Sequence, residues 1–355
     1  MKPLLRNPLV WLVLAASIVL LVVLFPQKQK PAVDFTGIAF NSMAWQVRLS
    51  RLPEGVSRES VQQALQARID EVDRILSTWR DDSELSAFNN SPAGSRFSAS
   101  PLLQASVATA LSVSDWSDGA YDITVGPLVN LWGFGPSGPR KSLPSDAEIM
   151  AAKRLVGWRH LQLPAGNTGI LTKDSPVRID LSSLGEGAAV DAMTAWLESV
   201  GARDYLVSVA GTLAVSGRKP DGSLWELAIE RPDASGQLQK VLPLTDMAMS
   251  TSGAYRNYFE RDGVRYSHTI NPATGRPISH HGVSVTVLLP RMAGKASGVV
   301  ARTDAMATAL NVLGPDAGLQ LAERDRVAAL FIEKTPAGFI EKPTSAFKAV
   351  TSHPQ

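Results

Sequence analysis

The sequence contains no cysteine, and this absence excludes disulfide bonds, thiolate zinc sites, iron–sulfur clusters and thiol nucleophiles together. A chain without thiols suits an oxidising compartment. An excess of positive charge is also lacking, because 35 Lys and Arg residues face 33 Asp and Glu residues and leave a formal net charge of +2. Binding to a nucleic-acid backbone requires a strong basic field, so we expect no nucleic-acid partner.

Long apolar runs are scarce, and the one that stands out lies near the N-terminus. Residues 9–25 carry no charge and are flanked by Lys2 and Arg6 on one side and by Lys28 and Lys30 on the other. A helix of this length, rising about 1.5 Å per residue, spans about 26 Å, which is near the lower limit for a bilayer core. Small residues suited to signal cleavage do not follow the run, so the sequence favours an uncleaved anchor over a removed signal peptide.

The rest of the chain has the composition of a globular protein, with 45% hydrophobic residues and no internal repeat. We expect four regions, namely a cytoplasmic N-terminus at 1–8, a transmembrane signal-anchor at 9–25, a linker at 26–34 and one large catalytic domain at 35–350. Helices are predicted at 57–79 with Ser57 as the N-cap, from Pro101 to Gly119, and at 293–313 before Gly314 and Pro315.

Strand patterns dominate the second half of the chain. Residues 204–217 and 224–230 flank the turn sequence "KPDG" and are predicted to form a hairpin. Further strands are expected at 282–290 and 326–333. Helices and antiparallel hairpins without regular alternation indicate the α+β class.

Two polar patterns could carry chemistry. Asp304 and Thr308 lie four residues apart in a predicted helix, so a carboxylate and a hydroxyl project from one face and form an oxygen pair suited to Mg²⁺. The alternative is a solvated Asp beside an ordinary half-buried Thr. The turn around Gly185 and Gly187 follows a predicted strand and begins a helix, where backbone N–H groups favour phosphate, although many strand–turn–helix junctions bind nothing.

Three of the five histidines lie in "YSHTINPATGRPISHHG", residues 266–282. Their spacing, without cysteine, does not match a standard zinc site. His268, on a predicted strand, is a candidate general base or hydrogen-bond donor, and a structural role is the alternative. His280 and His281 are interpreted as incidental. The hydroxyl cluster at 250–252 is interpreted as turn chemistry.

Five blocks of sequence stand out in order along the chain. They are "STWRDDSELSAFN", "GAYDITVGPLVNLWGFGP", "DLSSLGEGAAVD", "STSGAYRNYFERDGVRYSHTINPATGRP" and "TDAMATALNVLG". Their order and spacing resemble those of the ApbE family, the FAD:protein FMN transferases. The resemblance extends over roughly residues 34–347. It implies an α+β catalytic domain in which FAD binds with Mg²⁺, FMN is joined through its phosphate to a Thr or Ser of a target protein, and AMP leaves.

The resemblance also assigns roles to residues, each carried over from its block. The metal is expected at Asp304, Thr308, Ser183 and the carbonyl of Ala307. His268 is expected to assist deprotonation of the acceptor hydroxyl, with Asp304 as the second catalytic residue. Contacts with FAD are expected from Trp79, Ala120, Tyr121, Asp122, Asp180, Glu186 and Ile270.

Several positions depart from the family pattern. Phe40 and Asn41 stand where Met-Gly is common, Asn271 stands where Asp is usual, and Glu186 stands where many members have Lys and a subset has Glu. Ala210 and Thr212 replace a Gly and an often acidic residue. None of these departures falls on Asp304 or Thr308 themselves, so the resemblance favours an active enzyme.

The resemblance also implies a setting and partners. We expect a bacterial inner-membrane enzyme whose catalytic domain faces the periplasm, and whose targets are proteins of membrane redox complexes that carry covalent FMN. Three alternatives keep part of this picture. They are a Mg²⁺-dependent FAD pyrophosphatase, a non-catalytic flavin-binding or assembly protein, and a periplasmic domain that binds another small ligand.

Overall fold

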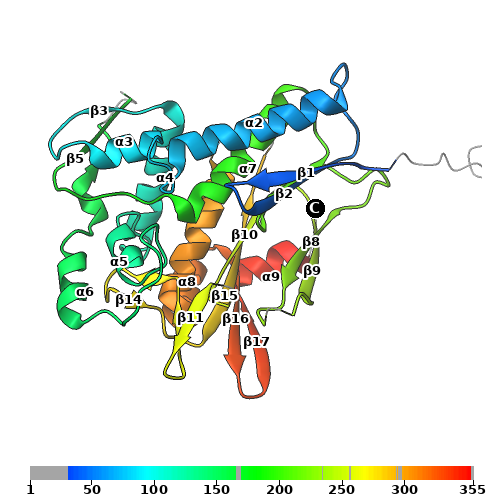
Figure 1. Ribbon diagram of the computed structural model, residues 1–355. Helices are drawn as coiled ribbons and strands as arrows, with labels where there is room; N and C mark the ends of the chain where they lie inside the picture. Colours follow the sequence, from blue (N-terminus) through cyan, green and yellow to red (C-terminus); the bar gives the residue numbers. More distant parts are fainter. Residues whose placement is uncertain are drawn as a thin grey trace, which may run out of the picture.

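The computed structural model describes residues 31–164, 169–233, 235–255, 257–292, 294 and 298–352 (Figure 1). The predicted N-terminus, anchor and most of the linker lie outside these residues. Within the described part of the chain, no helix is both long and apolar enough to cross a membrane.

An eight-stranded antiparallel sheet forms the centre of the molecule. Its spatial order is β1-β2-β6-β7-β10-β15-β16-β17. The strands are β1 (Val33–Ala39), β2 (Met43–Leu49), β6 (Tyr205–Val209), β7 (Thr212–Ser216), β10 (Met247–Gly253), β15 (Gly282–Pro290), β16 (Ala328–Thr335) and β17 (Gly338–Pro343).

The two faces of this sheet carry different layers (Figure 1). One face is covered by α2 (Arg58–Leu76), α7 (Ser182–Ser199) and α8 (Val299–Arg324), with α4 (Pro101–Trp116) packed behind them. The other face packs against the two-stranded sheet of β8 (Trp225–Glu230) and β9 (Leu238–Leu244) and against α9 (Ser345–Ser352). Apolar residues at alternate strand positions are buried in these two layers, which explains why the central strands are hydrophobic on both faces.

Short elements build a peripheral region beside the helical layer. These are α3 (Glu84–Asn90), β3 (Phe97–Ser98), α5 (Gly126–Leu131), α6 (Asp146–Lys153), η2 (Trp158–His160), β4 (Leu161–Gln162), β5 (Ile170–Lys173), β11 (Tyr258–Arg261), β12 (Val264–Ser267), β13 (Ile270–Asn271) and β14 (Arg276–Pro277). The architecture confirms the α+β class.

The predicted helices are present, with shifted ends. Ser57 caps α2 by accepting a hydrogen bond from the Ser60 N–H at 3.1 Å, as expected. The helix predicted at 293–313 begins only at Val299. It breaks at Gly314, whose φ of 75° and ψ of 179° are not helical, and then continues to Arg324. Gly and Pro therefore kink this helix rather than end it.

Two strand predictions were wrong. Residues 204–217 are two strands, because positive φ values at Ala210 (50°) and Gly211 turn the chain between β6 and β7. The strand β8 then leaves the main sheet and pairs with β9, so no hairpin forms across 219–222. Residues 250–252 are also not a turn, since they lie in β10 between β7 and β15.

Candidate functional site

The candidate site lies where the backbones of α7 and α8 come into close contact. A Cβ atom on Gly187 would lie 2.6 Å from the Cα of Ala301 and 2.6 Å from the carbonyl oxygen of Val300, so only glycine fits there. Further along α7, the Asp191 carboxylate accepts hydrogen bonds from the N–H groups of Val300 (3.2 Å) and Ala301 (2.9 Å) at the start of α8. Burial raises the pKa of this carboxyl to about 6. Glycine and Asp191 therefore set the spacing of the two helices.

This close packing places the half-buried Asp304 against the first turns of α7. Its Oδ2 accepts a hydrogen bond from the Gly187 N–H at 3.1 Å. Its Oδ1 accepts bonds from the hydroxyls of Ser250 at 2.9 Å and Thr212 at 3.5 Å. Ser250 and Thr212 are buried on β10 and β7. The sheet therefore binds Oδ1 of the carboxylate, and α7 binds Oδ2.

A second carboxylate lies beside the first. The Thr212 hydroxyl also lies 3.2 Å from Oε2 of Glu186. Burial raises the pKa of both carboxyls, and the charge of Glu186 raises that of Asp304 further. A nearby cation would relieve this repulsion, so the electrostatics of the pair fit a metal ion.

The residues predicted to bind Mg²⁺ offer only oxygen donors. Thr308 lies one helical turn after Asp304 on α8, and Ala307 is fully buried between them. Ser183 lies in the first turn of α7 and donates a hydrogen bond from Oγ to the Tyr121 hydroxyl at 2.9 Å. In the described residues no cluster of three or more His, Cys, Asp or Glu side chains could hold a metal. One carboxylate with hydroxyl and carbonyl oxygens still suits Mg²⁺, which keeps several waters or phosphate oxygens in its shell.

Tyr121 and Asp180 connect the loop at 119–124 to the start of α7. Burial, and then the charges of Asp304, Asp180 and Asp122, raise the pKa of Tyr121, so its hydroxyl stays neutral near these carboxylates. The Asp180 N–H donates to the Ile123 carbonyl at 2.7 Å, and its Oδ1 accepts from the Ser182 N–H at 2.9 Å. These bonds bring the predicted flavin contacts Ala120, Tyr121 and Asp180 to one helix N-terminus.

Asp122 is a different case, although it lies in the same loop. Its Oδ1 accepts bonds from the Thr124 N–H (2.7 Å) and hydroxyl (2.6 Å), and its Oδ2 accepts from the Trp158 N–H at 3.1 Å. Burial raises its pKa. Both carboxylate oxygens of Asp122 are therefore used to stabilise the loop at 119–124. Any contact of Asp122 with flavin would involve its backbone.

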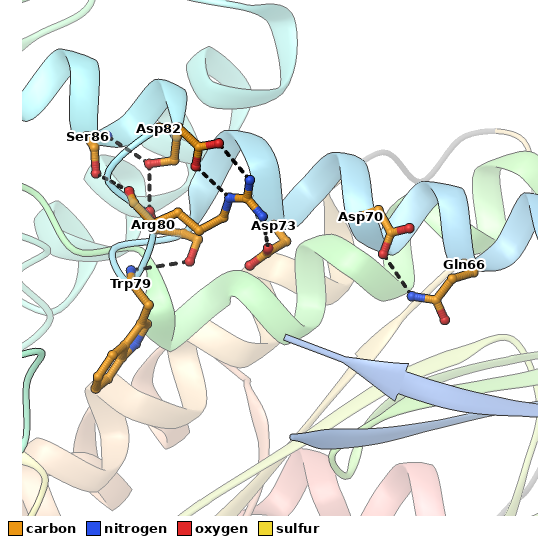
Figure 2. Close-up of polar contacts among 9 residues, drawn as sticks. Gln66, Asp70, Asp73, Trp79, Arg80, Asp82 and Ser86 are labelled. Atoms are coloured by element: carbon orange, nitrogen blue, oxygen red, sulfur yellow. Dashed lines mark hydrogen bonds and ion pairs between the residues drawn. The ribbon is translucent and has the colours of Figure 1, made fainter. Parts of the chain in front are cut away.

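Trp79 presents a large ring to solvent on a fixed backbone (Figure 2). Its side chain is 65% exposed. The next residue, Arg80, forms a two-bond ion pair with Asp82 at 2.8 and 2.9 Å and reaches Asp73 on α2 at 3.3 Å. In Figure 2 the Trp79 ring points away from this cluster. On the preceding residue, the Thr78 hydroxyl lies 3.2 Å from that of Ser182, which places the ring near the N-terminus of α7. A fixed, exposed ring in this position can stack on a planar ligand.

His268 lies on the other side of the site, among stacked aromatic rings. Phe134 meets the His268 ring edge-on at 6.3 Å and stacks on Phe259 at 5.4 Å. Phe259 stacks in turn on Tyr266 at 5.1 Å, and Tyr266 on Trp132 at 5.7 Å. We call these four residues, Trp132, Phe134, Phe259 and Tyr266, the aromatic stack. Burial lowers the pKa of His268, so the ring is neutral at neutral pH.

Ile270 does not present its side chain to the site. It is buried with Leu128, Trp132 and Ile149, so its predicted contact with FAD could involve only its backbone. The nearby Asn271 stabilises the following turn, because its Oδ1 accepts hydrogen bonds from Ala273 and Thr274. An Asp would accept the same bonds, so this departure preserves the local structure.

The structure therefore groups the predicted residues into two sets. One set surrounds the N-terminus of α7 and comprises Trp79, Ala120, Tyr121, Asp122, Asp180, Ser183, Glu186, Asp304, Ala307 and Thr308. The second set comprises His268 and Ile270 beside the aromatic stack. Sequence reasoning missed Ser250 as a partner of Asp304. The sequence held no signal for this contact, because Ser250, Thr251 and Ser252 are all polar and show no strand-like alternation.

The chain is similar to known proteins over most of its length. The family model described as "ApbE family" matches residues 42–331. A protein of Vibrio cholerae serotype O1 named FAD:protein FMN transferase is 39% identical over 346 residues, covering 96% of this chain and 99% of that protein. A protein of Escherichia coli K12 with the same name is 40% identical over 292 residues, which is 81% of each chain. The crystal structure of the flavinyl transferase ApbE of Pseudomonas stutzeri, in its apo form, superposes with a TM-score of 0.82 at 40% identity, covering 93% of this chain and 99% of that one.

Proposed function

Because the chain belongs to the ApbE family, we propose that it transfers FMN from FAD to a hydroxyl group of a target protein and releases AMP. The observation that best supports this reaction is the position of Asp304. This carboxylate accepts a hydrogen bond from the Gly187 N–H in the first turns of α7, and the backbone N–H groups and the Ser182 and Ser183 hydroxyls at the start of that helix can receive a pyrophosphate.

Mg²⁺ is part of the proposal, with Asp304, Thr308, Ser183 and the Ala307 carbonyl as its protein ligands. When bound, the ion would neutralise the pyrophosphate and stabilise charge on the leaving AMP. The protein holds Asp304 ready for this role through three hydrogen bonds, from Gly187, Ser250 and Thr212. Because the carboxylate is already oriented, little reorganisation is needed when the substrate binds.

His268 is proposed to accept the proton of the acceptor hydroxyl. Its Nδ1 lies 3.0 Å from the carbonyl oxygen of Asn257, and a carbonyl can only accept, so Nδ1 carries the hydrogen. The lone pair is then on Nε2, which is the form a general base requires. The acceptor oxygen forms a bond with the FMN phosphorus, the bond from that phosphorus to the bridging oxygen breaks, and AMP leaves with that oxygen.

The acceptor and the location extend the proposal. We expect Thr or Ser as the flavinylated residue and proteins of membrane redox complexes as the targets. Residues 9–25 would anchor the enzyme in the bacterial inner membrane, and the catalytic domain would face the periplasm.

An FAD pyrophosphatase is the alternative function that would use the same residues. The two reactions differ in the group that attacks the phosphate, which is a protein hydroxyl in one case and water in the other. The test incubates the purified protein with FAD, Mg²⁺ and a candidate acceptor and looks for flavin fluorescence on the acceptor after denaturing electrophoresis. Labelling that disappears in an acceptor Thr→Val variant supports transfer. Free FMN and AMP without labelling would support the pyrophosphatase, and unhydrolysed bound FAD would support a non-catalytic binding protein.

A further inference from the structure

One polar face of α8 extends beyond the proposed metal ligands Asp304 and Thr308. Asp304, Thr308 and Asn311 follow one another at intervals of four and three residues, so they share this face. Opposite them, Ser250 and Ser252 point from the same face of β10, because they are two residues apart in a strand. Ser250 binds Asp304, and Ser252 binds Asn311. The helix is thus fixed to the sheet at two points along its length.

Asn311 also reaches a third segment of the chain. Its side-chain NH₂ group donates to the Ser252 hydroxyl at 3.2 Å and to the Thr269 hydroxyl at 3.4 Å. Asn311 is 3% exposed and Thr269 is 7% exposed, so water does not compete freely for these bonds. Thr269 directly follows His268. His268 lies between β12 and β13 and not, as the sequence had predicted, on a strand. One amide group therefore joins the helix of Asp304 to the connecting segment that carries the proposed base.

The backbone of Asn311 makes a second connection to the same segment. His280 Nε2 donates to the Asn311 carbonyl oxygen at 2.7 Å, and His280 Nδ1 accepts from the Gly282 N–H at 3.2 Å. The ring also packs on Gly314, where an added Cβ would lie 2.6 Å from its Cδ2 atom. These contacts show that the interpretation of His280 as incidental was wrong. His280 holds the far end of residues 266–282 at the kink of α8.

The proposed reaction gives no role to the four side chains that make these contacts. None of them is assigned to FAD or to the metal; they are Asn311, Ser252, Thr269 and His280. No hydrogen bond in the described residues joins His268 directly to Asp304, so their relative position depends on intermediate contacts. We propose that Asn311 is a positioning residue, which fixes the segment bearing His268 relative to the helix bearing Asp304. The expected effect of Asn311 on kcat rests on the proposed function. Its effect on the position of His268 does not depend on that function.

The test replaces Asn311 by Leu, which has a similar size and no polar group. Groups at the N-terminus of α7 still bind FAD, so the KM for FAD should stay within about twofold of wild type. His268 would be held less precisely relative to the reacting hydroxyl, so kcat for transfer should fall about tenfold. Thr269→Val removes only the bond on the His268 side and should act in the same direction, which covers the case in which Asn311→Leu does not fold.

A matched control lies on the opposite face of β10. Thr251 and Thr286 form a hydroxyl pair at 2.8 Å between β10 and β15, and Thr251 points from the face of β10 opposite to Ser250. Thr286→Val removes this buried hydrogen bond of the same kind and should leave kcat and KM unchanged. A loss of kcat in this variant equal to that of Asn311→Leu would overturn the inference, because general loosening of the sheet would then explain both.

A second measurement does not depend on turnover. Imidazole resonances of ¹⁵N-labelled histidines should report a changed environment for His268 in Asn311→Leu and in Thr269→Val, and no change in Thr286→Val. Unchanged His268 resonances in both of the first two variants would overturn the inference. If wild-type protein labels no acceptor, the proposed function fails, and the resonances still decide whether Asn311 positions His268.

Discussion

The two sides of the site are built in different ways. Asp304 lies among regular elements, where α7, α8, β7 and β10 meet through short contacts and buried hydroxyls. His268 lies beside two-residue strands and a hairpin, and aromatic rings supply the neighbouring packing. On the Asp304 side, hydrogen bonds orient the carboxylate, and Gly187 packs so closely on α8 that no side-chain atom could be added there. The His268 side depends more on apolar area, which tolerates changes of shape better.

This contrast agrees with the roles proposed for the two residues. A group that stabilises developing charge must be held rigidly, because electrostatic stabilisation acts best in a preorganised site. A base that must admit the side chain of another protein needs access from outside. The different construction of the two sides matches these two requirements, and substitutions on each side test the contrast.

The largest effect is expected on the Asp304 side. Asp304→Asn keeps the size of the side chain and removes its charge, so transfer should fall about 1000-fold or more through lost metal binding and several kcal/mol of lost transition-state stabilisation. The assay measures kcat for acceptor labelling at saturating Mg²⁺. Asp316→Asn, at an exposed position on the same helix, is the control and should retain the wild-type rate. A normal rate in Asp304→Asn would remove this carboxylate from the mechanism.

The next effect is expected on the other side of the site. His268→Gln should lower kcat about 100-fold, in the range that general bases contribute. Burial lowers the pKa of His268 below its usual value of about 6.5, so the ring stays a base as pH falls, and the rate should decline only below that pH. The variant should lose this decline in its pH–rate profile. His281→Gln, at an exposed position in the same segment, should behave as wild type.

Packing on the Asp304 side can be tested without an activity assay. Gly187→Ala should destabilise the protein by about 2 kcal/mol, because its Cβ would lie 2.6 Å from the backbone of α8. Thermal unfolding measures the loss. Gly185→Ala is the matched control on the same helix, since an added Cβ there meets nothing within 4 Å, and it should be neutral or stabilising by up to about 1 kcal/mol. Equal stability of the two variants would show that the helices can separate at little cost.

The smallest effect should come from the aromatic stack. Phe134→Leu keeps an apolar side chain and loses the ring contacts with Phe259 and His268, so it should cost about 1 kcal/mol of stability and lower kcat less than tenfold. Phe97→Leu removes a comparable ring contact with Phe88 at a distance from His268 and should lower stability alone. A loss of kcat in Phe134→Leu as large as that in His268→Gln would mean that both sides require equally rigid geometry.

The sequence predicted the elements of the fold better than their connections. Caps and breaks such as Ser57 and Gly314 act locally, so they could be located from neighbouring residues. The pairing of β8 with β9 could not, because a strand pattern does not identify its partner when several strands compete. The positive φ of Ala210, which separates β6 from β7, also has no strong local signal in an Ala-Gly pair.

The same limit applies to the site. Asp304 and Thr308 were found from their spacing along one helix, and the other contacts of the site came with the family resemblance. Ser250 and Asn311 belong to the site only through contacts between distant segments, Ser250 with Asp304 and Asn311 with Ser252 and Thr269. Neither residue carries a local pattern that distinguishes it from an ordinary buried polar side chain.

Flavin transfer itself is tested most directly by a mass balance. The purified protein is incubated with FAD, Mg²⁺ and an acceptor domain, while AMP is quantified and the intact mass of the acceptor is recorded. The account predicts one AMP released for each FMN added to the acceptor, and neither product with Asp304→Asn. AMP accompanied by an equal amount of free FMN, with the acceptor mass unchanged, would contradict it.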